Sequence, residues 1–209
     1  MNGHGEDGAM GISGRGLALA AATATLALGT PPRADAEMAT YEIDPDHVTV
    51  AFTIMHAGYA RTLGRFADVE GTIRYDAEAQ ELGEVTARIG AASVQTWHEA
   101  RDEHVRSADF LDAAAHPQIT FTATGAEPTS DTTGKVMGNL TIRGVTQPVT
   151  LDVTLNKLAD YPCCHGRETL GISATTTILR SDFGSTYALP TFVGDEVEIM
   201  LEFEAIRAD

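Results

Sequence analysis

The chain has 209 residues, the size of one domain or of one domain with an additional segment. It is 43% hydrophobic and 21% charged and contains 13 aromatic residues, which excludes wholesale disorder and collagen-like repetition. Fourteen Lys and Arg residues against 30 Asp and Glu residues give a net charge of −16. This charge repels phosphate backbones and anionic membrane surfaces, so we expect a globular protein that does not bind nucleic acid.

The first 36 residues have the pattern of an export signal. Arg15 precedes the uncharged run Gly16–Gly29, and Ala34-Asp35-Ala36 has small residues at both positions that signal peptidase recognises. The run is shorter than a membrane-spanning helix requires. We therefore predict a signal peptide over residues 1–36 and an exported domain over residues 37–209. A disordered Ala-rich tail is the alternative, and acidic residues before Met10 leave the true start codon open.

Apolar and polar residues alternate through most of the remaining chain. In the segment His47–His56, Val48, Val50, Phe52 and Ile54 fall on one face. Alternation of the same kind recurs in seven later segments: 69–75, 85–91, 119–123, 136–142, 149–155, 172–178 and 197–205. A period of two residues is typical of half-buried strands, so the sequence predicts eight of them.

One segment interrupts the alternation and predicts a short helix. Thr96 is followed three residues later by Glu99, the pattern of a capping box. We expect the helix to begin after Thr96 and to run to about Asp109. Trp97, Val105 and Ala108 would then share one face, with Arg101 and His104 close to it.

Eight long antiparallel strands with a single short helix fit a closed barrel better than a sandwich. Alternation alone does not show which face lies inside the barrel. Thirteen aromatic residues are too few for the two girdles of an outer-membrane barrel, so we expect the apolar residues to face the lumen. A lumen of eight strands either holds one small ligand or is filled by its own side chains.

The sequence lacks the usual signatures of catalysis and of metal binding. The triplet Asp182–Gly184 occurs without the other kinase motifs, and the neighbours Cys164 and His165 have poor geometry for a nucleophile and its base. His98 and His104 lie six residues apart, on different helix faces, so they do not form a zinc pair. We therefore expect no enzyme activity, no cofactor and no metal.

The candidate binding residues each have a structural and a functional interpretation. Arg101 and His104 either contact the head group of a ligand, or belong to a helix that the pair Asp102 and Arg106 supports at i, i+4 spacing. The histidines that bracket the first strand, His47 and His56, could serve only to pin loops. Four apolar residues are either core or cavity lining: Phe52, Ile54, Ile89 and Phe121.

Several blocks of the chain resemble the YceI-like family. The most specific is Gly138–Val149, and the segment His47–Gly58 is similar to the opening strand of that family. Further matching blocks follow the family's order: Gly64–Phe66, Arg101–Ser107, His116–Phe121, Arg180–Gly184 and Val193–Val197. Val48 and Val105 depart from the family's usual Ser and Leu, and the loop Cys163–His165 is not part of its pattern.

The resemblance implies an all-β, eight-stranded antiparallel lipocalin-like barrel with one short helix. It also implies a periplasmic protein that binds a polyisoprenoid, such as a prenyl pyrophosphate or an isoprenoid quinone, for carriage, storage or stress response. We place the ligand-binding residues at eight positions: Phe52, Ile54, His56, Ile89, Trp97, Arg101, His104 and Phe121. An enzyme acting on an isoprenoid or another stress-generated small molecule, and a structural barrel with a filled core, are the alternatives. Transient contact with a membrane or membrane protein, and self-association, are left open.

Overall fold

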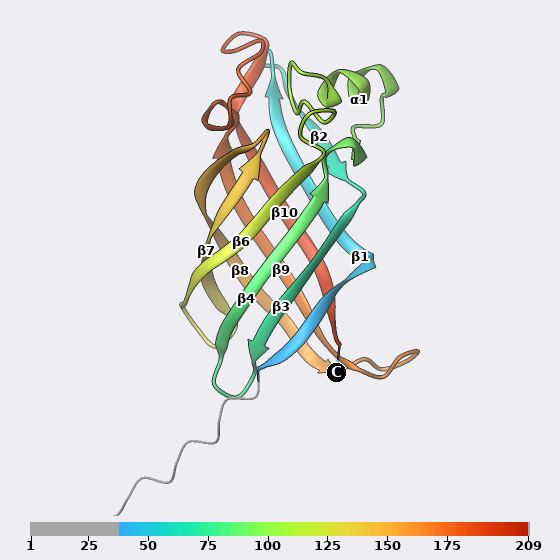
Figure 1. The fold of residues 1–209 in the computed structure, drawn as a ribbon, viewed down its shortest axis with the longest axis vertical. Helices are drawn as coiled ribbons and strands as arrows, with labels where there is room; N and C mark the ends of the chain where they lie inside the picture. Colours follow the sequence, from blue (N-terminus) through green and yellow to red (C-terminus); the bar gives the residue numbers. More distant parts are fainter. Residues whose placement is uncertain (1–37, 209) are drawn as a thin grey trace, which may run out of the picture. The chain divides into compact units, whose positions relative to one another are not determined.

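The computed structural model describes residues 38–208, so the predicted signal peptide lies outside the described residues. This part of the chain is an antiparallel barrel of long strands with one α-helix at one end (Figure 1). The strands are β1 (Ala39–His56), β2 (Ala60–Phe66), β3 (Val69–Asp76), β4 (Glu81–Gly90), β5 (Val94–Gln95), β6 (Gln118–Pro128), β7 (Thr133–Ile142), β8 (Val145–Asp160), β9 (Glu168–Leu179) and β10 (Val193–Arg207).

Eight of these strands close into a barrel, as the sequence predicts. Neighbours pair in the order β10-β9-β8-β7-β6-β4-β3-β1, and β1 then pairs with β10 to complete the circle. The long strand β1 has two partners on its other edge, because Ala39–Glu42 pairs with β3 and Val50–His56 pairs with β2. The short strands β2 and β5 extend the wall outside the closed circle. The predicted fold class is confirmed.

The apolar face of each strand points into the barrel. In β10, Val197, Ile199, Leu201 and Phe203 border the lumen, while Glu198 and the other glutamates of this strand alternate with them. Glu198 makes an ion pair with Arg61 of β2 at 2.7 Å. The outer wall is therefore polar and the lumen apolar, as the counting of aromatic residues indicated.

The helix differs from the prediction in its start and its end. The helix α1 spans Glu99–Arg106, and its N-cap is His98, whose Nδ1 accepts a hydrogen bond from the Arg101 N–H at 3.3 Å. Thr96 is not the cap because its N–H and hydroxyl both donate to the Asp102 carboxylate instead. The predicted capping box is therefore wrong, and the helix is shorter than expected.

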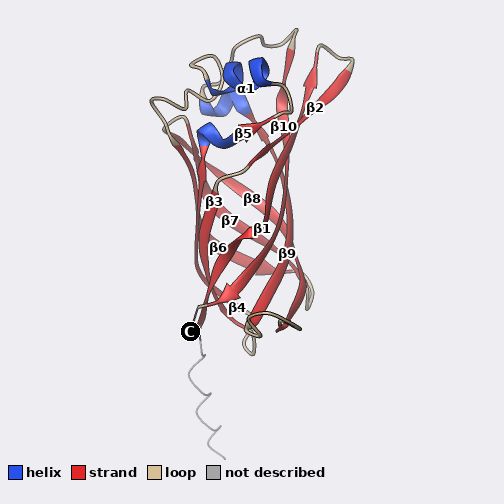
Figure 2. Ribbon diagram, turned by 90° about the vertical axis from the view of Figure 1, so that its right-hand side faces the viewer, coloured by secondary structure: helices blue, strands red, loops and turns tan. Residues whose placement is uncertain are grey.

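The barrel has two chemically different ends, which we call the helix end and the terminus end. The helix end carries α1 and the connections 57–59, 91–117, 143–144 and 180–192. The terminus end is the one at which β1 begins and β10 ends, with the connections 77–80, 129–132 and 161–167. Figure 2 shows the helical segments gathered at the first end only. Within residues 38–208, no helix has the length and hydropathy to cross a bilayer.

Candidate ligand-binding site

The barrel encloses a cavity of about 1010 Å³. This volume lies at the upper limit of ligand pockets, which span about 300–1,000 Å³. Its wall is formed by apolar side chains from the strands of the barrel, and it reaches from the helix end to the terminus end. Inward residues such as Val153 and Leu201 are half-buried because they border empty space. A barrel filled by its own side chains does not fit this structure.

Two phenylalanines line the wall without blocking the lumen, because each ring lies over a glycine. A Cβ atom on Gly64 would stand 2.3 Å from the ring of Phe52, and one on Gly138 would stand 2.3 Å from that of Phe121. Phe52 also contacts Phe66, with ring centroids 5.7 Å apart. The two glycines therefore give the aromatic rings room against the wall.

Seven of the eight predicted binding residues border the cavity: Phe52, Ile54, His56, Ile89, Arg101, His104 and Phe121. Their contact with a ligand remains a prediction. Trp97 lies elsewhere, because it is 67% exposed and is not part of the cavity wall. It precedes the helix with a φ of +60°, so it does not share the inward helix face on which the sequence placed it.

Arg101 holds the segment before the helix as well as bordering the cavity. Its Nε donates to the Thr96 hydroxyl at 2.8 Å, and its Nη2 donates to the Thr96 carbonyl at 2.7 Å. Thr96 in turn donates from its backbone to Asp102 at 2.6 Å, and its hydroxyl is the main cause of a lowered pKa at that carboxyl. Arg101 therefore has a structural role through Thr96, whereas Arg106 donates to the Ala92 and Val94 carbonyls. Contact of Arg101 with a head group stays a prediction.

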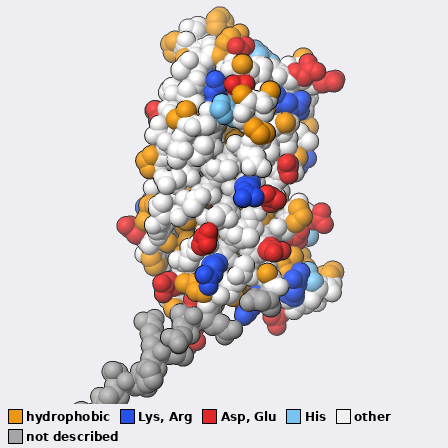
Figure 3. Space-filling model, viewed as in Figure 1, with side chains coloured by type: hydrophobic (Ala, Val, Ile, Leu, Met, Phe, Trp, Pro, Cys, Tyr) orange, Lys and Arg blue, Asp and Glu red, His pale blue; other side chains and the backbone are white. Residues whose placement is uncertain are grey.

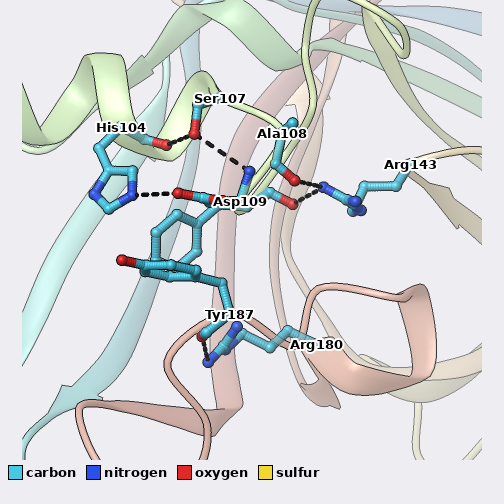
Figure 4. Close-up of polar contacts among 8 residues, drawn as sticks. His104, Ser107, Ala108, Asp109, Arg143, Arg180 and Tyr187 are labelled. Atoms are coloured by element: carbon cyan, nitrogen blue, oxygen red, sulfur yellow. Dashed lines mark hydrogen bonds and ion pairs between the residues drawn. The ribbon is translucent and has the colours of Figure 1, made fainter.

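An aromatic cluster borders the cavity at the helix end. The rings of His104, Phe110 and Tyr187 make edge-to-face contacts, with centroids 5.0–5.4 Å apart. Asp109 lies 2.9 Å from the His104 Nε2 (Figure 4). Since Tyr187 belongs to the 180–192 connection, this cluster joins that connection to the helical segment.

Arg180 is a buried cation of the cavity wall that sequence reasoning did not single out. It is 6% exposed, and its guanidinium donates four hydrogen bonds of 2.8–3.0 Å to backbone carbonyls. The acceptors are the carbonyls of Ser185, Tyr187, Val193 and Gly194. Burial lowers the pKa of this guanidinium, which also lies over the Phe110 ring at 5.6 Å. In the sequence it is marked only as the first residue of the family block Arg180–Gly184, which does not indicate that its side chain is buried.

The ionisable groups around the cavity differ between its ends. At the helix end they are cationic or become so on protonation: His56, Arg101, His104 and Arg180. At the terminus end the charged lining is mainly acidic, with one lysine: Glu81, Glu127, Asp131 and Lys135. Gln80 adds a neutral polar side chain there. Lys135 makes an ion pair with Asp152 at 2.6 Å. The arginines of the cavity wall therefore lie at the helix end, and its acidic residues at the terminus end.

A second cluster of titratable residues lies outside the cavity. It consists of Asp44, His47 and Glu204. Within residues 38–208, this is the group whose side-chain oxygen and nitrogen atoms lie close enough together to hold a metal ion, all within 4.8 Å of one another. His47 Nδ1 is 2.8 Å from the Asp44 carboxylate, so this pair pins the β-bulge between Ile43 and Val48 of β1. The two cysteines are free and exposed in the β8–β9 connection, also away from the lumen.

Comparison with known proteins agrees with this architecture. Residues 41–205 match the YceI-like domain. The chain belongs to the YceI-like family. It is 35% identical to a UPF0312 protein of Pseudomonas savastanoi pv. phaseolicola over 192 residues, covering 91% of this chain and 95% of that one. It is 38% identical to Protein YceI of Salmonella arizonae over 171 residues, covering 81% and 87%.

Solved structures share the barrel of this YceI-like protein. The Burkholderia cenocepacia protein BcnA superposes with a TM-score of 0.69 at 24% identity, over 78% of this chain and 98% of that one. The Campylobacter jejuni YCEI protein gives 0.65 at 31% identity, over 74% and 90%. A polyisoprenoid binding domain of Saccharophagus degradans gives 0.58 at 14% identity, over 82% and 99%. The first and third of these likenesses show the fold alone.

Proposed function

We propose that this YceI-like protein binds a long apolar lipid in its lumen, and that the lipid is an isoprenoid. One observation carries the proposal: a continuous apolar cavity of about 1010 Å³ runs between the two ends of the barrel. A strand the length of β10, with 15 residues, extends about 50 Å, so such a lumen suits a chain rather than a compact ligand. The polyisoprenoid binding domain of Saccharophagus degradans, which has the same fold, supports this ligand class.

The chain of the lipid would set the affinity and its head group the direction. Each buried CH₂ contributes about 0.8 kcal/mol, so a long prenyl chain has more gross burial energy than binding requires. Ordering of the chain offsets much of it, since affinities saturate near −18 to −21 kcal/mol. A pyrophosphate head would lie at the helix end, where Arg101 and His104 border the cavity. A quinone head would need no cation there.

Binding rather than catalysis is the proposed activity. Two of the polar groups nearest to the helix end of the cavity are engaged in holding the structure. His104 is oriented by Asp109 and by two aromatic rings, and Arg180 spends four donors on backbone carbonyls. Groups held in this way are suited to shape a site and less suited to transfer protons.

The decisive experiment is native mass spectrometry of the protein purified from its own host, followed by lipid extraction. We expect a co-purifying apolar species whose fragments are spaced by isoprene units. Protein that carries no lipid and takes up no added prenyl alcohol would refute the proposal. Conversion of an added prenyl pyrophosphate to a new product would favour the enzyme instead.

The proposed site of action is the periplasm, where the predicted signal peptide would direct the chain. N-terminal sequencing of the protein from a periplasmic extract should then find Glu37 as the first residue. Recovery of the protein with an intact N-terminus from the cytoplasm would contradict this location.

A further inference from the structure

The large apolar side chains exposed on the barrel gather at one end. Within residues 38–208, eight such side chains are exposed, and four of them stand on connections of the helix end: Tyr59, Trp97, Tyr187 and Phe192. Val145 and Leu179 are the end residues of β8 and β9 next to these connections, while Leu63 and Met200 lie on the wall in β2 and β10. None lies on the connections of the terminus end. We call Tyr59, Trp97, Tyr187 and Phe192 the aromatic rim.

The aromatic rim is continuous with the lumen. Tyr187 and Phe192 border the cavity and are also 46% and 63% exposed to solvent. The turn that carries Tyr59 is attached to the same connection, because the Ala57 N–H donates to the Phe192 carbonyl at 2.8 Å. Apolar surface therefore extends from inside the barrel to its outer edge. At the terminus end the exposed residues that border the cavity are mainly polar, so no such path exists there.

We propose that the aromatic rim docks the helix end onto the surface of a zwitterionic lipid bilayer. The docked barrel would turn the helix end of its lumen toward the lipid phase. An apolar chain could then pass from the bilayer into the lumen without crossing water. The purpose of docking rests on the proposed function, because the bilayer would supply or receive the bound lipid. The docking itself needs no bound ligand.

The form of the rim favours a bilayer over a protein partner. Its four side chains stand on three separate connections, 57–59, 91–117 and 180–192, and Figure 3 shows hydrophobic side chains at this end set among polar ones. A stable protein interface needs about 800 Å² of matched surface on each partner, which separate tips do not provide. Fluid lipid fills the gaps between them, and Tyr and Trp are the residues enriched at membrane interfaces.

Charge selects the kind of bilayer. The net charge of −16 opposes approach to an anionic surface, and the four rim residues carry no positive charge to offset it in the way that polybasic segments do. Docking would therefore depend on apolar insertion and be strongest on zwitterionic lipid. Anionic lipid added to the vesicles should weaken docking, and added salt should recover part of the lost docking by screening the repulsion.

The test uses Trp97, the only tryptophan of the sequence and part of the rim. Residues 37–209, which contain all ten strands, are mixed with phosphatidylcholine vesicles, because the apolar run Gly16–Gly29 would bind lipid by itself. We expect a blue shift of the Trp97 emission and flotation of the protein with the vesicles. The double variant Tyr59→Ser, Phe192→Ser should lower the partition coefficient at least tenfold.

The control is Met200→Ser, which removes an apolar side chain that is 46% exposed on the wall and should leave flotation unchanged. Thermal unfolding of each variant shows that the fold is retained. Wild-type protein that does not float, or an equal loss with the control, would overturn the proposal. A blue shift that grows with protein concentration without vesicles would assign the rim to a second copy. The vesicles contain no prenyl lipid, so this test is independent of the proposed function. Docking can succeed where isoprenoid binding fails, and isoprenoid binding can succeed where docking fails.

Discussion

The two ends of the barrel are held together in different ways. At the terminus end, the β6–β7 turn is held largely by its own residues, since Ser130 and Thr129 both contact the Thr133 hydroxyl at 2.7 Å. Gln80 and the Leu155 N–H add one bond each to its carbonyls. At the helix end, the contacts join parts of the chain that are far apart in sequence: Arg143 donates to the Phe110 carbonyl, and His104 packs on Tyr187. A polar hairpin satisfies its backbone locally, whereas an apolar, ligand-accessible end has to be assembled from several connections.

The largest effect should follow removal of Arg180, which holds the 180–192 connection. In Arg180→Ala, four backbone carbonyls lose a charged donor, and we expect a loss of about 3 kcal/mol or more in the free energy of unfolding. Urea denaturation measures it. The control Arg88→Ala removes an exposed arginine with one long ion pair of 3.5 Å and should change stability by less than about 0.5 kcal/mol. Equal stability of the two variants would show that the helix end does not depend on this guanidinium.

Blocking the lumen should weaken ligand binding strongly without affecting either end of the barrel. Ala87 borders the cavity from β4, and Ala87→Phe would project a ring into the space that a long chain has to cross. We expect binding of a fluorescent prenyl alcohol to weaken by roughly 100-fold, since several buried CH₂ groups are lost at about 0.8 kcal/mol each. Thr122→Phe, on the outer face of the neighbouring strand β6, is the control and should bind normally. Similar binding by both variants would place the ligand outside the lumen.

A smaller and more selective effect is expected for Arg101→Ala. Two of its donors are engaged by Thr96, so a head group can use only those that remain. A charge-assisted hydrogen bond contributes about 1.5–3 kcal/mol, so a prenyl pyrophosphate should bind about tenfold or more weakly. A neutral quinone of equal chain length should be nearly unaffected, as titration of both ligands would show. Equal losses would mean that Arg101 acts only through the segment before the helix.

The smallest effect concerns pH and the outer wall. The hydrogen bond to Asp44 raises the pKa of His47 above its ordinary value of 6.5. Because the folded pKa is the higher one, the stability from this pair is fully present below the unfolded pKa and is lost as pH rises through the folded value. Melting temperatures of wild type and His47→Ala should therefore differ slightly at pH 5 and converge at pH 9. A difference that increases toward pH 9 would contradict this assignment.

Much of the fold could be predicted because strands are encoded locally. The alternation of Val197, Ile199, Leu201 and Phe203 with charged residues specifies a strand and its inward face from neighbouring residues alone. Apolar positions such as Phe52 and Phe121 were found in the cavity wall for the same reason. Closure through β1 and β10 follows once eight such strands need partners for both edges.

The helix end was decided by the tertiary structure. Trp97 faces outward because His98, rather than Thr96, begins the helix, and Thr96 is engaged by Asp102 and Arg101. Arg180 becomes a buried cation only when the chain between Ser185 and Gly194 folds back around its guanidinium. That the lumen is empty depends on the joint volume of side chains from eight strands, which no local pattern encodes. Local periodicity thus sets the wall of the barrel, and contacts between distant residues set its opening.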